Sequence, residues 1–292
     1  MSEASEGLSE SNSRCVSARK ILDAVRLKGR AVAALNFYNA ETLRAHIMAA
    51  TALRAPLILQ TTESTINYLG LRLAVAMARA AAEDTGQLFA LHLDHGASYE
   101  LAARCIDAGY TSVMIDGSKL AFADNIALTR RVVDLAHAAG VSVEGELGHV
   151  AHNDEGSDPS RFYTDPEAAR QFVNETQVDA LAVAIGTAHG FYKGDVHLDF
   201  ERLRAIRDAV GATPLVLHGG SGVEDKLLTE AIDSGIAKIN FGTEIKNTFT
   251  RAVKASLLSS DEIDLRKTFL PAIDAVREVS AAKIRICQRN PD

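Results

Sequence analysis

Eight short apolar runs, separated by stretches with helical periodicity, constrain the fold of this 292-residue chain more than any other feature. The runs cover residues 31–36, 56–60, 88–94, 112–116, 141–146, 180–186, 214–218 and 237–240. Between them, stretches such as ETLRAHIMAATALRA repeat apolar residues at the spacing of an amphipathic helix. This rhythm predicts an α/β fold, a (β/α)8 TIM barrel in a single domain. An open doubly wound sheet with fewer strands would give a similar rhythm.

Glycines support these predicted boundaries. Gly109, Gly140 and Gly235 each follow a helical stretch and precede an apolar run, which is the usual place of a glycine that ends a helix. No Pro-rich or Ser-rich linker divides the chain after its polar, acidic start. We therefore expect a disordered N-terminal tail over residues 1–16 and one barrel domain over residues 17–292.

Charge and cysteine content indicate which partners to expect and in which cellular compartment. A net charge of −7 disfavours nucleic acid and an anionic membrane as partners. Three cysteines in no metal-binding spacing leave at least one thiol unpaired, which is typical of a reducing cytoplasm. The acidic start resembles no targeting peptide, and no apolar run is long enough for a bilayer. We expect a cytoplasmic protein.

Nearly every apolar run closes on a polar side chain. In chain order these are Asn36, Gln60, Asp94 with His95, Asp116, Glu146, His189, His218 and Asn240. A single such residue is best explained as a helix cap or a satisfied core group. In a barrel, however, the C-terminal ends of all strands share one mouth, where catalytic groups lie. The set of eight therefore predicts one site at that mouth.

Three of these strand-end residues are histidines. His95, His189 and His218 would leave one position of a tetrahedral zinc ion open, which is typical of a catalytic site. His92 shares a sheet face with Asp94, and it either orients that carboxylate or packs in the core. The other five histidines are expected outside the site: His46, His137, His149, His152 and His197.

The carboxylates have two interpretations each. Asp94 adjoins a predicted ligand and can exchange a proton with a substrate hydroxyl, or it can support a ligand histidine. Asp116 and Glu146 can hold a second metal position or form ion pairs inside the barrel. Glu144 shares a face with Glu146 and can support it.

Two segments predict a phosphate site. HGGSGV, residues 218–223, places glycines between the seventh run and the next helix, where backbone amides can approach an anion. NFGTE, residues 240–244, follows the eighth run and adds the Thr243 hydroxyl. The loops after strands seven and eight are the usual phosphate site of this fold.

The motifs together resemble the class II fructose-bisphosphate and tagatose-bisphosphate aldolases. The resemblance rests on LNFYN, LHLDHG, GYTSVMIDGS, VEGELG, YTDPEAA, VAIGTAHGFYKG, LVLHGGSGV and KINFGTE, in this order along nearly the whole chain after the tail. It implies a zinc-dependent (β/α)8 enzyme of carbohydrate metabolism, as in glycolysis, that forms homodimers or homotetramers. The implied reaction is reversible cleavage of a ketose phosphate or bisphosphate. Its products are dihydroxyacetone phosphate and an aldehyde such as glyceraldehyde 3-phosphate.

The resemblance also implies a role for individual residues. His95, His189 and His218 match the zinc ligands, and Asp94 matches the group that exchanges the proton of the cleaved bond's hydroxyl. Asp116 and Glu146 match a second position, for a divalent or monovalent cation. The substrate-binding positions are Thr62, Gly190, Gly219, Gly220, Ser221, Asn240, Phe241, Gly242 and Thr243.

One segment departs from the family pattern. After GELG many members carry a glycine pair and an acidic cluster that exchanges a proton with the enediolate, whereas this chain reads HVAHNDEGSDPSRF. Asp154 and Glu155 are the available acids. The alternatives are an aldolase for another ketose phosphate, such as a deoxy sugar acid or sulfonated sugar phosphate, or a sugar-phosphate-binding barrel without turnover. A zinc hydrolase would share the histidines but would not need the phosphate loops.

Overall fold

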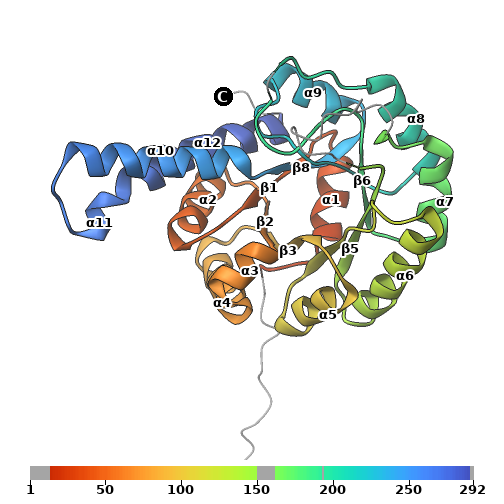
Figure 1. Ribbon diagram of the computed structural model, residues 1–292, viewed down its shortest axis with the longest axis horizontal. Helices are drawn as coiled ribbons and strands as arrows, with labels where there is room; N and C mark the ends of the chain where they lie inside the picture. Colours follow the sequence, from red (N-terminus) through yellow and green to blue (C-terminus); the bar gives the residue numbers. More distant parts are fainter. Residues whose placement is uncertain (1–13, 150–161, 193, 290–292) are drawn as a thin grey trace, which may run out of the picture.

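Eight parallel strands pair in chain order and close into a barrel, which confirms the predicted (β/α)8 fold in one domain (Figure 1). The computed structural model describes residues 14–149, 162–192 and 194–289. The strands are β1 (Val32–Asn36), β2 (Leu57–Thr62), β3 (Phe89–Gly96), β4 (Ser112–Ile115), β5 (Ser142–Leu147), β6 (Ala180–Val183), β7 (Leu215–Leu217) and β8 (Ile236–Phe241).

Helices surround the barrel as the periodicity predicted. They are α1 (Ala18–Arg26), α2 (Ala40–Ala52), α3 (Glu63–Leu69), α4 (Leu71–Thr85), α5 (Tyr99–Ala108), α6 (Phe122–Ala138), α7 (Pro166–Thr176), α8 (Phe200–Val210), α9 (Asp225–Asp233), α10 (Thr243–Ser259), α11 (Leu265–Thr268) and α12 (Leu270–Gln288). Gly109, Gly140 and Gly235 have positive φ just after α5, α6 and α9, as expected of glycines that end helices. No helix of the described residues is long and apolar enough to cross a membrane.

Helix α1 closes the end of the barrel where the strands begin, and it is seen through the ring of strands in Figure 1. Ile21, Leu22 and Val25 of α1 are buried against small inward-facing residues, among them Ala34 and Ala90. Three residues of the predicted tail are ordered at this end of the barrel. Cys15 forms an isolated parallel β-bridge with Phe89, and the backbones of Arg14 and Val16 hydrogen bond to the backbone of Phe89. The barrel is therefore open to ligands at its other end, where the strands finish.

One predicted strand is longer than the observed one. The apolar run over residues 180–186 stays buried as far as Ile185, but β6 ends at Val183. His189 therefore lies on the loop between β6 and α8, and it does not end a strand. A buried loop and a buried strand look alike in hydropathy, so the run alone could not separate them.

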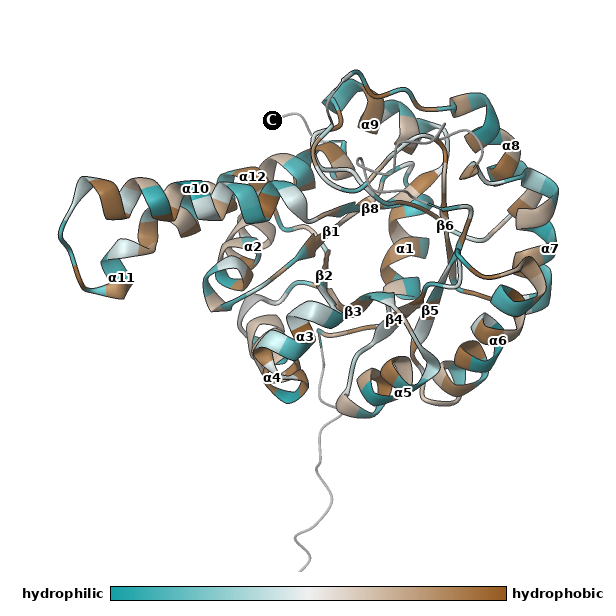
Figure 2. Ribbon diagram, viewed as in Figure 1, coloured by the Kyte–Doolittle hydropathy of each residue, from teal (hydrophilic) through white to brown (hydrophobic). Residues whose placement is uncertain are grey.

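Helices α10 and α12 form an arm that extends from the barrel, with α11 near its tip (Figure 1). The large side chains of Leu257, Leu258, Ile263, Leu265 and Leu270 are exposed on this arm. Figure 2 shows hydrophobic positions along the same arm, whereas the helices around the barrel bury most of theirs against the strands.

Candidate active site

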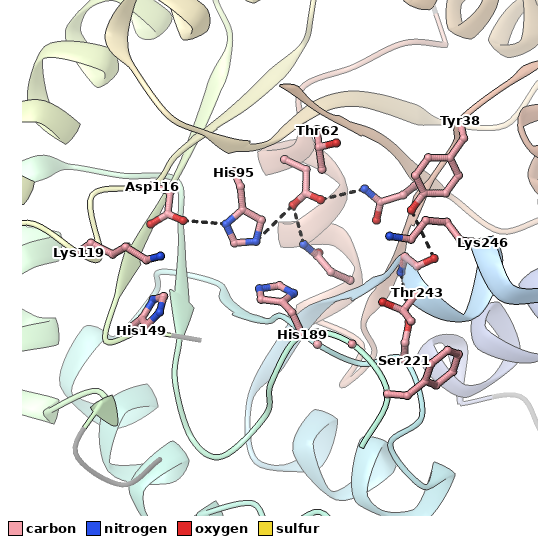
Figure 3. Close-up of a pocket in the computed structure, with 17 residues that line it drawn as sticks. Tyr38, Thr62, His95, Asp116, Lys119, His149, His189, Ser221, Thr243 and Lys246 are labelled. Carbon is pink, nitrogen blue, oxygen red and sulfur yellow. Dashed lines mark hydrogen bonds and ion pairs between the residues drawn. The ribbon is translucent and has the colours of Figure 1, made fainter. Parts of the chain in front are cut away.

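A cavity of about 610 Å³ opens at the C-terminal ends of the strands. Most of the predicted site residues line it: Thr62, Asp94, His95, Asp116, His189, Gly190, Gly219, Ser221, Asn240, Gly242 and Thr243. Figure 3 shows His95 and His189 at its centre, with Asp116 on one side and Ser221 and Thr243 on the other. Polar groups from strands far apart in the sequence thus meet at the barrel mouth, as their strand-end positions predicted.

The end of β3 is irregular where its two functional side chains lie. Successive strand residues point to opposite faces, so Asp94 and His95 should not both face the mouth. His95, however, has a φ of 50°, and the pairing of β3 with β4 shifts register between Leu93 and Gly96. A positive φ is uncommon for a residue with a side chain, and such strain concentrates at functional sites. Here it brings both side chains into one cavity.

Three histidines cluster as the sequence predicted. The ring nitrogens of His95, His189 and His218 lie within 4.8 Å of one another, and Nε2 of His95 is 2.9 Å from Nδ1 of His218. The second nitrogen of two rings is held by a carboxylate: His95 Nδ1 donates to Asp116 at 2.8 Å, and His218 Nε2 donates to Glu144 at 2.8 Å. When both rings are neutral, as a metal requires, these bonds leave His95 Nε2 and His218 Nδ1 as the unprotonated nitrogens that face the centre of the cluster.

This donor set fits a metal ion. Histidine ligands of metals almost always give their other ring N–H to a carboxylate or carbonyl, which is the arrangement of His95 and His218. Burial lowers the pKa of His95, but its hydrogen bond to Asp116 and the charges of Asp94 and Glu146 outweigh burial and raise it to about 10. The cluster therefore lies in a strongly negative environment that favours a cation.

A second group of possible ligands shares His95. The ligand atoms of His95, Asp116 and Glu146 lie within 4.8 Å of one another, with Glu146 Oε2 3.8 Å from His95 Nδ1. Asp116 already accepts hydrogen bonds from His95 and from the backbone and hydroxyl of Ser118. Both predicted roles of Asp116, an ion pair inside the barrel (here with His95) and a second cation position, are compatible with this geometry.

Asp94 is fixed by three amides. Asn36 donates to Oδ2 at 2.9 Å and Gln60 to the same oxygen at 3.3 Å, while Asn240 donates to Oδ1 at 3.2 Å. Burial raises the pKa of this carboxyl, but the charges of His95, His218 and Lys238 outweigh burial and lower it below its usual value. Asp94 is therefore ionised and held at a fixed position beside the histidines, as a proton acceptor must be.

His92 does not orient Asp94, which was one of its two predicted roles. Its Nδ1 is 2.7 Å from the Ser112 hydroxyl, and its Nε2 is 3.2 Å from the Lys238 ammonium. Burial, together with the charge of Lys238, lowers the pKa of His92 to about 3, so the ring is neutral. Glu144 likewise supports His218 instead of Glu146.

The glycine-rich loop after β7 is joined to the start of α10. The Ser221 hydroxyl accepts hydrogen bonds from the backbone amides of Gly242 and Glu244, both at 3.2 Å. A Cβ on Gly219 would lie 2.5 Å from the Ala188 carbonyl oxygen, so only glycine fits there. This loop and the N-terminus of a 17-residue helix form a cradle that suits a phosphate.

Two predicted substrate-binding residues do not line the cavity. Phe241 is fully buried in the core, with the Lys283 ammonium 5.6 Å from its ring, and Gly220 packs against Ile239 and Phe241. The alternation of β8 explains this, because Asn240 points into the barrel and its neighbour must point outward. Asp154 and Glu155 lie outside the described residues.

Sequence reasoning missed several residues that line the cavity. These are Tyr38, Lys119, His149, Phe191 and Lys246, of which His149 was expected outside the site. His149 and Lys119 follow β5 and β4 by a few residues, which placed them on loops whose course the sequence did not reveal. Lys246 lies in the first turn of α10, and its ammonium is 5.7 Å from the Tyr38 ring.

Comparison with known proteins decides the family. The family described as fructose-bisphosphate aldolase class-II matches residues 16–291. The chain belongs to this family. The motifs that resembled class II aldolases therefore identified it correctly, and this class II aldolase is a lyase of the aldolase type.

Solved structures agree with the family. The YdjI aldolase from Escherichia coli K12 is 34% identical to this class II aldolase over 94% of the chain and 97% of its own, with a TM-score of 0.83. A candidate fructose-1,6-bisphosphate aldolase from Coccidioides immitis is 28% identical over 96% and 98%, with a TM-score of 0.85. The fructose-bisphosphate aldolase from Campylobacter jejuni, 22% identical over 95% and 97% with a TM-score of 0.81, shares the fold.

Proposed function

We propose that this class II aldolase is zinc-dependent and cleaves a ketose phosphate or bisphosphate to dihydroxyacetone phosphate and an aldehyde such as glyceraldehyde 3-phosphate. The observation that carries the proposal is the cluster of His95, His189 and His218 beside the ionised Asp94. Three imidazoles would hold the zinc and leave a position for substrate oxygens. When bound, zinc supplies a Lewis acid that polarises the substrate carbonyl.

The protein's own groups do the remaining work. Asp94 accepts the proton of the substrate hydroxyl as the carbon–carbon bond breaks, and Asn36 and Asn240 keep its carboxylate oriented toward that proton. The cradle formed by the loop at Ser221 and the N-terminus of α10 binds the phosphate of the dihydroxyacetone half. Asp116 and Glu146 are proposed to hold a second cation.

The positions of two lysines favour a substrate that carries a negative charge at both ends. Lys246 lines the cavity next to the phosphate cradle, and Lys119 lines its other side beside Asp116 and His149 (Figure 3). An ammonium at each end suits a bisphosphate, and it also suits a ketose phosphate that ends in a carboxylate or sulfonate.

A panel of ketose phosphates tests the proposed function. We expect one or more of fructose 1,6-bisphosphate, tagatose 1,6-bisphosphate, a deoxy sugar acid phosphate and a sulfonated sugar phosphate to release dihydroxyacetone phosphate, measured by coupled reduction with NADH. Matched monophosphates serve as controls for the far-end charge. Tight binding of these compounds without any product would instead indicate a binding barrel without turnover.

We further propose that the aldolase forms homo-oligomers in the cytoplasm. Five large apolar side chains, Leu257, Leu258, Ile263, Leu265 and Leu270, are exposed on the arm built from α10, α11 and α12. Clustered exposure of this kind marks association surfaces. Light scattering should give a multiple of the 31.2 kDa chain mass, and Leu258→Glu with Ile263→Glu should reduce it. A monomeric wild-type mass would refute the proposal.

A further inference from the structure

Lys238 is a fully buried lysine on β8 that points into the barrel and does not line the cavity. Burying an ammonium is unfavourable unless it is paired and hydrogen-bonded. Lys238 has two partners: its Nζ donates to Glu144 Oε2 at 2.7 Å and lies 3.2 Å from His92 Nε2. Because burial of the Lys238 ammonium is costly and Lys238 does not line the cavity, we expect this residue to act through a neighbour.

The neighbour that links Lys238 to the candidate metal site is Glu144. One carboxylate oxygen of Glu144 binds Lys238, and the other accepts the Nε2–H of His218 at 2.8 Å. Both oxygens are therefore engaged, so the carboxylate cannot rotate without breaking a charged hydrogen bond. His218 in turn keeps Nδ1 directed at His95 Nε2.

His92 completes the support from the other side. The ammonium can only donate, so His92 accepts at Nε2 and gives its Nδ1–H to the Ser112 hydroxyl. His92, Glu144, His218 and Lys238 are all buried. The chain of hydrogen bonds thus runs from Ser112 on β4 through β3, β8 and β5 to His218 after β7.

The two supported histidines differ in how they are held. Asp116, which holds His95, is partly exposed and is bound by Ser118 at the rim of the barrel. Glu144, which holds His218, is 2% exposed and is backed by a full positive charge. We propose that Lys238 is a positioning residue that fixes Glu144, and through it the Nδ1 lone pair of His218, for metal binding. This inference rests on the proposed zinc site.

A double-mutant cycle between Lys238 and Glu144 tests this role. Lys238→Met keeps most of the side-chain length and removes the charge, so Glu144 loses the partner that fixes its second oxygen. We expect zinc affinity, measured by chelator competition on the full-length protein, to fall by about 10–100-fold, as is usual for outer partners of metal ligands. The visible spectrum of the cobalt-substituted protein should change as well, since it reports ligand geometry and a purely structural role would leave it unaltered.

Glu144→Gln is the second arm of the cycle. In the Glu144→Gln background, removal of Lys238 leaves no buried carboxylate unpaired, so the double variant is expected to fold even if Lys238→Met alone does not. Lys238→Met should then lower zinc affinity little further. Lys283→Met is the matched control: it removes another buried lysine, paired with Glu244, and should leave zinc affinity unchanged.

The outcomes separate this inference from the proposed function. Wild-type zinc affinity and cobalt spectrum in Lys238→Met, or equal losses from that change in both backgrounds, would overturn the role of Lys238 while leaving the zinc site standing. A wild-type protein that binds neither zinc nor cobalt would overturn the proposed zinc site itself.

Discussion

Replacing His95 with alanine is expected to abolish zinc binding and cleavage together. The substitution removes one of three clustered imidazoles, and it also frees Asp116 from the ring that it holds. Zinc per chain, measured by atomic emission after dialysis, should fall close to zero. Release of dihydroxyacetone phosphate should fall to background.

The matched control is His149→Ala, which removes a histidine that lines the same cavity but belongs to neither possible ligand group among the described residues. It should keep the wild-type zinc content. A full zinc content in His95→Ala would show that the metal is held elsewhere.

Replacing Asp94 with asparagine should separate proton transfer from metal binding. Asparagine has nearly the same shape, and its one oxygen can still accept from Asn36 and Gln60, while Asn240 must turn its amide to accept from the new NH2 group; the proton acceptor is lost. We expect the cleavage rate to fall by about 10²–10⁴-fold, the usual contribution of a general acid–base group. Zinc content should change little, and exchange of the dihydroxyacetone phosphate C–H proton should survive better than cleavage.

Asp134→Asn on the exposed face of α6 is the control for this change, and it should alter neither rate. If Asp94→Asn also empties the metal site, Asp94 is a ligand or a support of a ligand. Its assignment as the proton acceptor would then be wrong.

Much of the fold follows from local patterns that the sequence displays. The β1 and β2 runs are apolar because their residues are buried on both faces, and in these two strands polar residues appear only toward the end that reaches the mouth, as at Asn36 and Gln60. Such a pattern depends on each strand alone. It therefore predicted the barrel, its mouth and the histidine cluster without knowledge of any long-range contact.

Contacts between strands were harder to predict. Strand alternation places both His92 and Lys238 inside the barrel, but the stagger between β3 and β8 decides that they meet. For this reason the prediction that His92 orients Asp94 was wrong. Phe241 was a different kind of error, because the inward position of Asn240 already required its neighbour to point away from the cavity.

The neighbours Asp94 and His95 show where regular geometry misleads. Alternation would send one of them to the helices, and the irregular backbone at His95 prevents this. Nothing in the apolar pattern signals that local change. Only the chemistry of an aspartate next to a histidine at a strand end indicated that both belong to the site.

Whether catalysis uses a metal or a Schiff base is the most direct test of the proposed zinc mechanism, because Lys119 and Lys246 line the cavity and Lys238 lies in the barrel behind His218. The measurement is sodium borohydride treatment with an accepted ketose phosphate, followed by intact-mass spectrometry and by assay of the metal-stripped and zinc-restored protein. We predict an unmodified mass, loss of cleavage on metal removal, and recovery with about one zinc per chain. A reduced substrate–lysine adduct, or full cleavage by the metal-stripped protein, would contradict the zinc mechanism.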